Sequence, residues 1–258
     1  MAKIAITGAA GFIGSHAAKK FKSQGHEVVG FDNFNDYYDP TLKYDRSEKL
    51  KEAEIFIDHG DLMDQVFLEE FMHGHKPDIV LHLAAYANVR HSFKDPEKYY
   101  NNNIIGTHNL ITACQVAGVN KVVYASTSCV MHGNELPWKE DEKYGHPNNP
   151  YGVSKSTNES QFKCSSIPVT VGLRFFTVYG PWGRPDMAPY IFLESMLSNK
   201  TIKIYNYGKM RRDFTYIEDV VEGLFRCCFK PIINNISSPY LEQTAPFEIF
   251  NIGNGNPI

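Results

Sequence analysis

The feature that most constrains this chain is a glycine cluster close to its N-terminus. The run Lys3–Thr7 is predicted to be a short buried strand, Gly8–Gly14 the turn after it, and Phe12–Gln24 the helix that the turn opens. Glycines let the backbone come close to a pyrophosphate, and the unpaired N–H groups at the start of the helix attract its negative charge. The pattern therefore predicts a dinucleotide site. The alternative is a tight structural turn without a ligand.

A second apolar strand, Val28–Phe31, is followed directly by Asp32. An acidic residue at this distance from the glycine turn is typical of a contact with the adenosine ribose hydroxyls. Asp32 would repel a 2′-phosphate, and no arginine stands in the next few positions to accept one. The sequence therefore favours NAD over NADP as the cofactor.

Length and composition limit the class of protein. The 258 residues, of which 43% are hydrophobic, suffice for one large core or for one core and a smaller lobe. There is no apolar run long enough to span a bilayer and no signal-like segment at the N-terminus, so we expect a cytoplasmic protein that does not enter membranes. The net charge of -3 and the scattered Lys and Arg residues argue against nucleic acid as a partner.

Neither the cysteines nor the histidines indicate a metal site. The 5 cysteines lack the paired spacing of a zinc site or a disulfide framework, and we expect them to be reduced, mostly buried thiols. The 10 histidines, His82 among them, show no metal-ligand spacing, so structural roles are expected for them. The chain is therefore expected to hold no metal.

Further along the chain, apolar strands alternate with helices. We expect strands near Glu54–Ile57, at Asp78–Leu83 and at Lys121–Ala125, and a crossover helix from Tyr99 to Ala117. Near-continuous apolar strands of this kind are typical of a parallel sheet that is covered on both faces. The expected fold is therefore α/β, a Rossmann-type doubly wound parallel sheet that binds ligands at the carboxyl ends of its strands.

Polar and small residues stand where these strands end. The hydroxyl run Ser126–Ser128 follows one strand, and Asp61 follows another. Asp61 could accept a hydrogen bond from the adenine amino group or could cap the next helix. The small residues in Leu83–Ala85 allow a cofactor to lie across the strand ends, although small residues also simply pack.

Tyr151 and Lys155 are predicted to share one face of a helix, because they stand four residues apart. A nearby ammonium, together with the positive nicotinamide ring of NAD, would favour the phenolate and lower the pKa of the tyrosine. Such a phenolate could remove an alcohol proton while hydride leaves for the nicotinamide. The spacing alone is also common on exposed helix faces. The spacing indicates a catalytic pair here because the hydroxyl run and the dinucleotide turn lie upstream of it.

On these motifs the chain resembles the extended short-chain dehydrogenase/reductase family, and within it the NAD-dependent nucleotide-sugar 4-epimerases. The resemblance covers nearly the whole chain and is most specific to the UDP-glucuronate 4-epimerases, through Asp32–Pro40, Gly172–Met187 and Tyr205–Tyr216. It implies conversion of UDP-glucuronate to UDP-galacturonate through a transient 4-keto intermediate, an isomerase reaction of polysaccharide biosynthesis. It also implies a homodimer.

The resemblance assigns roles to individual residues. It implies Tyr151 as the catalytic base, Lys155 as its partner and ligand of the nicotinamide ribose, and Thr127 as the hydroxyl that binds the sugar O4. Ser128 would lie close to the sugar. The residues implied to bind NAD are Gly8, Gly11, Phe12, Ile13, Gly14, Asp32, Asn33, Asp61, Leu62, Leu83, Ala84, Ala85, Asn103, Tyr151 and Lys155.

The residues after Thr127 bear on the type of reaction. Related dehydratases and decarboxylases carry an acidic residue just after that threonine, where this chain continues Ser128-Cys129. The acid assists proton chemistry at carbon 5, so its absence favours epimerisation over dehydration. The family's Val-Tyr-Gly is replaced here by Val130–Gly133, a departure in both length and identity.

Arginines are the candidates for holding a negatively charged substrate. The resemblance implies Arg212 as a ligand of the diphosphate, and the alternative is a surface ion pair with a neighbouring carboxylate. Arg184, with Thr177 and Arg90, is the candidate for gripping a C6 carboxylate, since a planar guanidinium can make two parallel bonds to it.

The chain is expected to divide into two parts. These are a NAD-binding domain over residues 1–176 and a smaller α/β substrate lobe over residues 177–258, from which segments near 213–225 and 247–252 return to the first domain. Family members continue past this point, so the lobe is expected to be C-terminally truncated. The alternatives to an active epimerase are a weakly active or inactive NAD-binding fragment, and a nucleotide-sugar dehydratase or decarboxylase.

Overall fold

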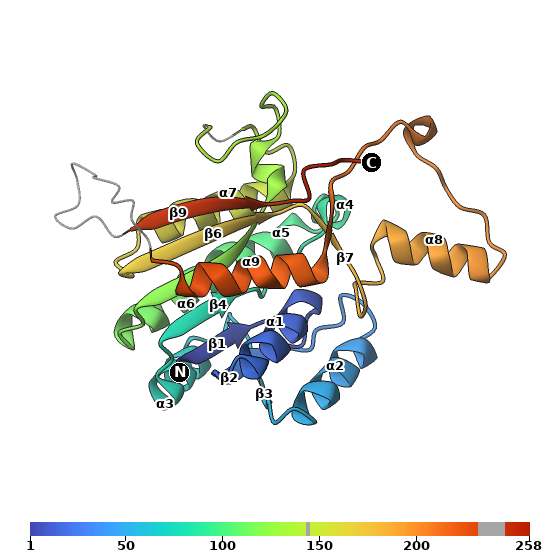
Figure 1. The fold of residues 1–258 in the computed structure, drawn as a ribbon. Coiled ribbons are helices and arrows are strands. Elements are labelled where there is room, and N and C mark those ends of the chain that lie inside the picture. The colour runs from blue at the N-terminus through green and yellow to red at the C-terminus, as the bar shows by residue number, and fades with distance from the viewer. Residues whose placement is uncertain (143–144, 232–245) are drawn as a thin grey trace.

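A central parallel sheet organises the chain, which a computed structural model describes over residues 1–142, 145–231 and 246–258. Its strands are β1 (Lys3–Thr7), β2 (Glu27–Asp32), β3 (Ile57–His59), β4 (Ile79–His82), β5 (Lys121–Thr127), β6 (Val169–Phe175) and β9 (Phe247–Ile252). They lie in the order β3-β2-β1-β4-β5-β6-β9, and every neighbouring pair is parallel (Figure 1). The predicted doubly wound α/β fold is confirmed.

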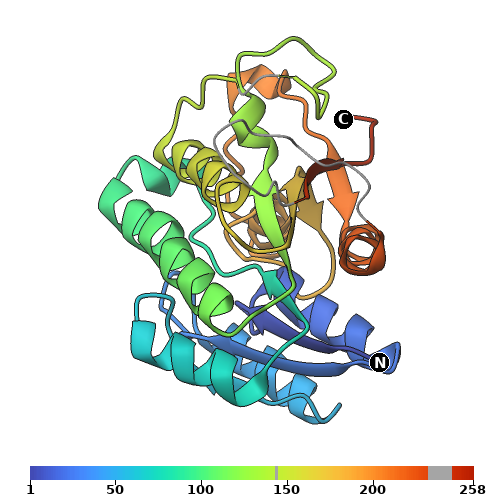
Figure 2. The same ribbon diagram turned by 90° about the vertical axis from the view of Figure 1, so that its left-hand side faces the viewer.

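Helices cover both faces of this sheet (Figures 1 and 2). One face carries α1 (Phe12–Ser23), α2 (Thr41–Lys51) and α9 (Ile217–Phe229), and the other carries α3 (Gln65–His75), α6 (Gly106–Val116) and α7 (Pro150–Lys163). Because successive strand residues point to opposite faces, Ile4 and Ile6 of β1 join the first core and Ala5 joins the second. Within the described ranges, no helix combines the length and apolarity that a membrane crossing needs.

Shorter elements connect these layers. They are α4 (Val89–Ser92), α5 (Pro96–Tyr99), a π-helical segment (Tyr100–Ile105), 3-10 turns at Ser128–Met131 and Asn206–Gly208, α8 (Ala188–Leu197), and the parallel pair β7 (Thr177–Tyr179) and β8 (Phe214–Tyr216). In Figure 1, α8 extends away from the sheet, and none of its residues is buried. Residues 232–245 of the predicted substrate lobe and 143–144 of the loop before α7 lie outside the described residues.

Two predicted elements differ in detail from the structure. The strand expected near Glu54–Ile57 begins only at Ile57, because the chain first closes α2: the Ile55 N–H donates to the Leu50 carbonyl at 3.0 Å, and Glu54 has a φ of 56°. The crossover helix expected from Tyr99 begins at Pro96 and contains the π-helical segment before α6.

The sheet order creates a crevice. From β1 the chain proceeds outward through β2 to β3, and it then returns to place β4 on the other side of β1. Open α/β sheets bind ligands at such a reversal, beyond the carboxyl ends of the strands. The predicted site residues at the ends of β1, β2, β4 and β5 therefore open onto one region.

Candidate active site

A single large cavity of about 1620 Å³ lies beyond these strand ends. Its wall brings together most of the residues singled out in the sequence. These are Gly8, Gly11, Phe12, Ile13, Gly14, Asp32, Asn33, Leu62, Leu83, Ala84, Ala85, Arg90, Thr127, Ser128, Tyr151, Lys155, Thr177, Arg184 and Arg212.

The glycine turn after β1 has the shape that a dinucleotide pyrophosphate requires. Gly8 has a φ of 70°, and a Cβ at this position would come within 2.8 Å of the Ala84 nitrogen. A Cβ on Gly14 would overlap the carbonyl oxygen of Gly8. No side chain from the described ranges caps the start of α1, so its first N–H groups are free to meet an anion. These residues fit NAD.

The end of β2 lines the side of the cavity where the adenosine of NAD is expected. Asp32 is buried, and its Oδ1 accepts hydrogen bonds from the Phe34 N–H and from the Lys43 ammonium, each at 3.0 Å. Asn33 also faces the cavity, and its Nδ2 donates to Asp61 Oδ2 at 2.8 Å. The side chain of Lys43 comes from α2 and was not identified in the sequence.

Two residues expected to line NAD are not on the wall. Asp61 lies behind Asn33, where it also accepts the Met63 N–H at 2.8 Å. It does not cap α3 either, because Asp64 does so by accepting the Phe67 N–H. Asn103 is buried in the π-helical segment and uses its amide to bind both main-chain polar groups of Tyr86, at 2.9 Å each. Asn103 therefore shapes the wall from behind.

The proposed catalytic hydroxyls meet at the junction of β5 and α7. Thr127 ends β5 and accepts the Cys129 N–H at 3.3 Å, which caps the short 3-10 turn that follows. Tyr151 stands in the first turn of α7, which begins at Pro150 and is capped by Asn149. Tyr151 and Thr127 both line the cavity, and the Thr127 side chain is close enough to lower the pKa of the Tyr151 phenol. Two hydroxyls from separate elements thus lie near each other on the cavity wall.

Burial governs the pKa of Tyr151. It raises this pKa above the ordinary value of 10.0, and the neighbouring Cys129 thiol raises it further. The Thr127 side chain and the positive charge of Arg184 act in the opposite direction and lower this pKa. The lowered pKa expected from the sequence is therefore not produced by these side chains alone, and the positive side chain that lowers it most is Arg184.

Lys155 lies one turn further along α7 and is fully buried. Burial lowers the pKa of its ammonium from 10.5 to about 8, and the charge of Glu159 partly opposes this shift. Glu159, another turn along, is itself held by Arg174, whose Nε and Nη2 donate at 3.0 and 2.9 Å. Arg174 also contacts the sulfur of Met131, so the unusual Val130–Gly133 segment packs onto this buried ion pair.

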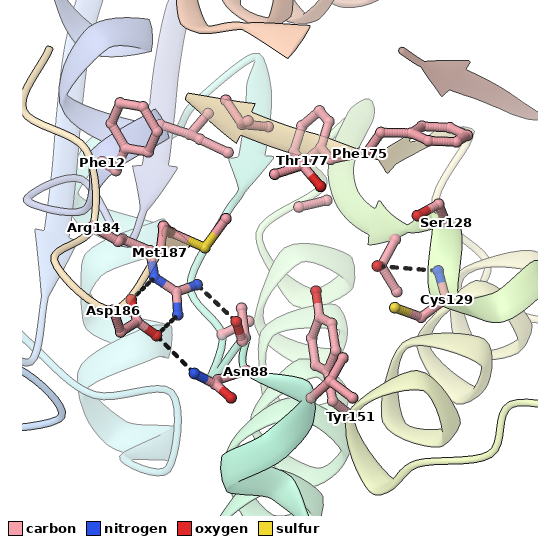
Figure 3. Close-up of a pocket in the computed structure, with 18 of the residues that line it drawn as sticks. Phe12, Asn88, Ser128, Cys129, Tyr151, Phe175, Thr177, Arg184, Asp186 and Met187 are labelled. Atoms are coloured by element: carbon pink, nitrogen blue, oxygen red, sulfur yellow. Dashed lines mark hydrogen bonds and ion pairs between the residues drawn. The ribbon is translucent and has the colours of Figure 1, made fainter. Parts of the chain in front are cut away.

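Arg184 lies across the cavity from Tyr151 (Figure 3). Its Nε and Nη2 donate to the two carboxylate oxygens of Asp186, and Nη1 donates to the Ala87 carbonyl at 2.7 Å. Asp186 also accepts from Asn88 at 2.8 Å and from the Tyr37 hydroxyl at 3.2 Å. The positive charge of Arg184 is therefore already paired with the Asp186 carboxylate inside the cavity.

The other expected substrate ligands differ in their surroundings. Arg90 stacks on the ring of Tyr205, 4.3 Å from its centroid, which ties α4 to the segment before β8. Arg212 is exposed, and its main chain pairs with that of Ile258. Its guanidinium donates to the Arg211 carbonyl, and it forms no ion pair with a described carboxylate. Thr177 begins β7 on the same wall.

Sequence reasoning missed the partners of the expected residues. Four such partners come from different segments and contact residues at or next to the cavity: Lys43, Asn88, Glu159 and Asp186. A signal existed only for Glu159, which continues the four-residue spacing of Tyr151 and Lys155 along one helix face. Among the described residues, no group of three His, Cys, Asp or Glu could hold a metal ion.

Comparisons with known proteins agree with this arrangement. Residues 4–236 match the family model described as "NAD dependent epimerase/dehydratase family". Protein CapI of Staphylococcus aureus is 40% identical to this chain, and the match covers 99% of this chain and 79% of that protein. UDP-glucuronate 4-epimerase 1 of Arabidopsis thaliana is also 40% identical, and the match covers 99% of this chain and 61% of that protein.

A solved structure shares the fold as well. The UDP-glucuronic acid 4-epimerase of Bacillus cereus, in complex with UDP-glucuronic acid and NAD, is 35% identical with a TM-score of 0.85. The alignment covers 99% of this chain and 79% of that one. The chain therefore belongs to the NAD-dependent epimerase/dehydratase family.

Proposed function

We propose that this chain inverts carbon 4 of a UDP-hexose with NAD as cofactor, and that the substrate is UDP-glucuronate. The observation that carries the proposal is that Tyr151 and Thr127 line one cavity with the glycine turn, and that Arg184 lies opposite Tyr151. Relatives at 40% identity that are named UDP-glucuronate 4-epimerases support the choice of sugar.

The glycine turn and the start of α1 would hold the pyrophosphate of NAD, Asp32 and Asn33 the adenosine side, and Lys155 the nicotinamide ribose. When bound, NAD supplies a hydride acceptor for carbon 4 that can return the hydride to the opposite face. This assignment of the cavity leaves its other end, toward Arg212, for the UDP-sugar.

The chain's own groups would handle the proton. Tyr151 takes the proton of the sugar 4-hydroxyl, and Thr127 holds that oxygen in place. Because burial raises the pKa of the Tyr151 phenol, ionisation requires positive charge nearby, which Arg184 and the bound nicotinamide ring supply. Rotation of the 4-keto sugar then presents its other face, and Tyr151 returns the proton.

A glucuronate substrate adds a hazard. Its 4-keto form is a β-keto acid, which loses carbon dioxide when the bond to the carboxylate aligns with the carbonyl π system. Arg184 and Thr177 lie on the cavity wall and are the groups we propose to hold the carboxylate out of alignment. The absence of an acid at Ser128 and Cys129 argues against a dehydratase or decarboxylase.

Proton NMR tests the proposal. Purified protein is incubated with UDP-glucuronate and NAD, and we expect the anomeric signal of UDP-galacturonate, with none from a Tyr151→Phe control. A product of lower mass would favour the decarboxylase instead. No product from UDP-glucuronate, UDP-glucose or UDP-N-acetylglucosamine, with NAD binding intact, would overturn epimerisation.

A NAD-binding chain with little turnover is the second candidate. The observation that favours it is α8, where Leu193, Met196 and Leu197 are all more than half exposed beside the substrate end of the cavity. Apolar side chains that face water in this way hold a sugar site closed less well than packed ones do. The same NMR experiment separates the two candidates.

A further inference from the structure

Lys43 forms a buried ion pair at the adenosine end of the cavity. Its Nζ lies 3.0 Å from Asp32 Oδ1, and the two side chains are only 7% and 5% exposed. Both residues line the cavity. Such a pair is far less screened by water than a surface pair, so each charge strongly affects the other.

The two carboxylate oxygens of Asp32 differ in their hydrogen bonds. Oδ1 accepts from Lys43 and from the Phe34 N–H, whereas no described residue donates to Oδ2. Oδ2 is therefore the atom left for a ribose hydroxyl. The Lys43 ammonium uses one of its three N–H groups on Asp32, and the face of the Tyr38 ring lies 5.7 Å away.

A second cation stands behind this pair. Arg46, one turn along α2, is buried and forms no ion pair with a described carboxylate. Its guanidinium donates instead to the Tyr38 hydroxyl at 2.8 Å and to the main chain of Ala10 and Trp182. The Asp32 carboxylate therefore lies near two buried cations, Lys43 and Arg46, and contacts Lys43 directly.

Cofactor choice at this position depends on charge. A carboxylate accepts the ribose 2′-hydroxyl and repels a 2′-phosphate, whereas a lysine or arginine attracts the phosphate. The sequence shows no cation directly after Asp32, but folding brings Lys43 to it from eleven residues away. The same wall therefore carries both the group that rejects a 2′-phosphate and a group that would bind it.

We propose that Lys43 is a latent 2′-phosphate ligand, which its ion pair with Asp32 keeps occupied. Preference for NAD then rests on a single carboxylate. Removing that carboxylate would leave a buried ammonium facing the ribose and would shift the site toward NADP. The inference rests on the proposed function, since it concerns the same dinucleotide site.

The test compares two adenosine fragments that differ only in the 2′-phosphate. Dissociation constants of 5′-AMP and adenosine 2′,5′-bisphosphate are measured by calorimetry for the wild type, Asp32→Ser, Lys43→Gln and the double variant. In Asp32→Ser we expect the affinity ratio to move about tenfold or more toward the bisphosphate, as expected for a charge-assisted contact. In the double variant most of that gain disappears.

Lys49→Gln is the matched control. Lys49 lies on the same helix but stacks over Trp182 and does not line the large cavity, so its loss should leave the fragment ratio unchanged. An equal gain for the bisphosphate in Asp32→Ser and in the double variant would overturn the inference.

Folding and cofactor binding are followed separately. Asp32→Ser leaves Lys43 buried without its partner, so its melting temperature should fall, and the bisphosphate should restore it more than 5′-AMP does. If this variant fails to fold, Asp32→Asn, which keeps the side-chain shape, replaces it: a shift of the ratio toward the bisphosphate that Lys43→Gln reverses supports the inference, and an equal shift with and without Lys43 overturns it. Failure of wild type to bind NAD and 5′-AMP would overturn the proposed function as well.

Discussion

Arg184 and Asp186 form a two-pronged ion pair inside the cavity, with Nε to Oδ1 at 3.0 Å and Nη2 to Oδ2 at 2.6 Å (Figure 3). With the bond from Nη1 to Ala87, three of the five guanidinium N–H groups are used. Any grip on a sugar carboxylate must come from the remaining two. The edge of Arg184 that faces Asp186 is not available, and Asp186 fixes the direction in which the free edge points.

Replacing Asp186 with Asn should therefore impair handling of the charged sugar. The variant removes the paired carboxylate but keeps the side-chain shape, so Arg184 loses the contact that orients it. We expect kcat/KM for UDP-glucuronate to fall about tenfold to a hundredfold, and that for UDP-glucose to fall less. Tyr37→Phe removes one hydrogen bond to the Asp186 carboxylate but leaves the Arg184–Asp186 pair in place, so it should cost only a few-fold. Equal losses on both sugars would contradict a role in orienting Arg184.

Replacing Arg184 with Lys should change the product as well as the affinity. Lysine keeps the charge but loses the planar fork, so the sugar carboxylate is no longer held in one direction. We expect a higher KM for UDP-glucuronate and a larger fraction of decarboxylated product by mass spectrometry, with Thr177→Val showing the same trend. Unchanged product ratio and affinity in both variants would remove these residues from the carboxylate site.

Tyr151→Phe should strongly impair turnover while NAD still binds. The variant removes the proposed proton acceptor from a buried, otherwise well-packed ring. Turnover should fall about 10²- to 10⁴-fold, the range for losing a general base. Thr127→Val, which removes the hydroxyl partner, should fall less. NAD affinity measured by calorimetry serves as the control, and a Tyr151→Phe protein with near-normal turnover would assign the proton to another group.

Lys155→Met should stabilise the cofactor-free protein at neutral pH although it impairs catalysis. The folded-state pKa of about 8 lies below the ordinary 10.5, so the buried ammonium is a cost that is fully present below pH 8. The variant should gain about 1–3 kcal/mol in unfolding free energy at pH 7. Between pH 8 and 10.5 the unfolding free energy of the wild type should rise toward that of the variant, because in this range the unfolded wild-type chain binds more protons than the folded one. Denaturant titrations across pH check this, with exposed Lys163→Met as the flat control.

Breaking the Glu159–Arg174 pair should destabilise the fold. Both side chains are buried, and Glu159→Gln leaves the Arg174 charge without its carboxylate. We expect a loss of about 3–5 kcal/mol by denaturant unfolding, and a smaller loss when both residues are replaced by apolar ones. Glu222→Gln breaks surface pairs with Arg226 and with Lys20 and should change little. A small effect of Glu159→Gln would mean that water reaches this site.

Local sequence determined the parts of this protein that depend on neighbours along the chain. The strand, glycine turn and helix at Lys3–Ser23, and the placement of Tyr151 and Lys155 one turn apart on α7, follow from spacing and residue type alone. The parallel sheet and the family were likewise predictable and are confirmed, because apolar strands and glycines leave direct marks in the sequence.

Tertiary structure decided which charged side chains form ion pairs. The partners Lys43 for Asp32, Asp186 for Arg184 and Arg174 for Glu159 depend on how α2, the turn before α8 and β6 pack, and residue spacing carries no information on those distances. Burial likewise raises the pKa of Tyr151 in the protein by itself, whereas the lowered pKa predicted from the sequence includes the charge of the nicotinamide ring. The sequence named the groups that we propose to do the chemistry, and packing set their charge and direction because only a folded chain excludes water.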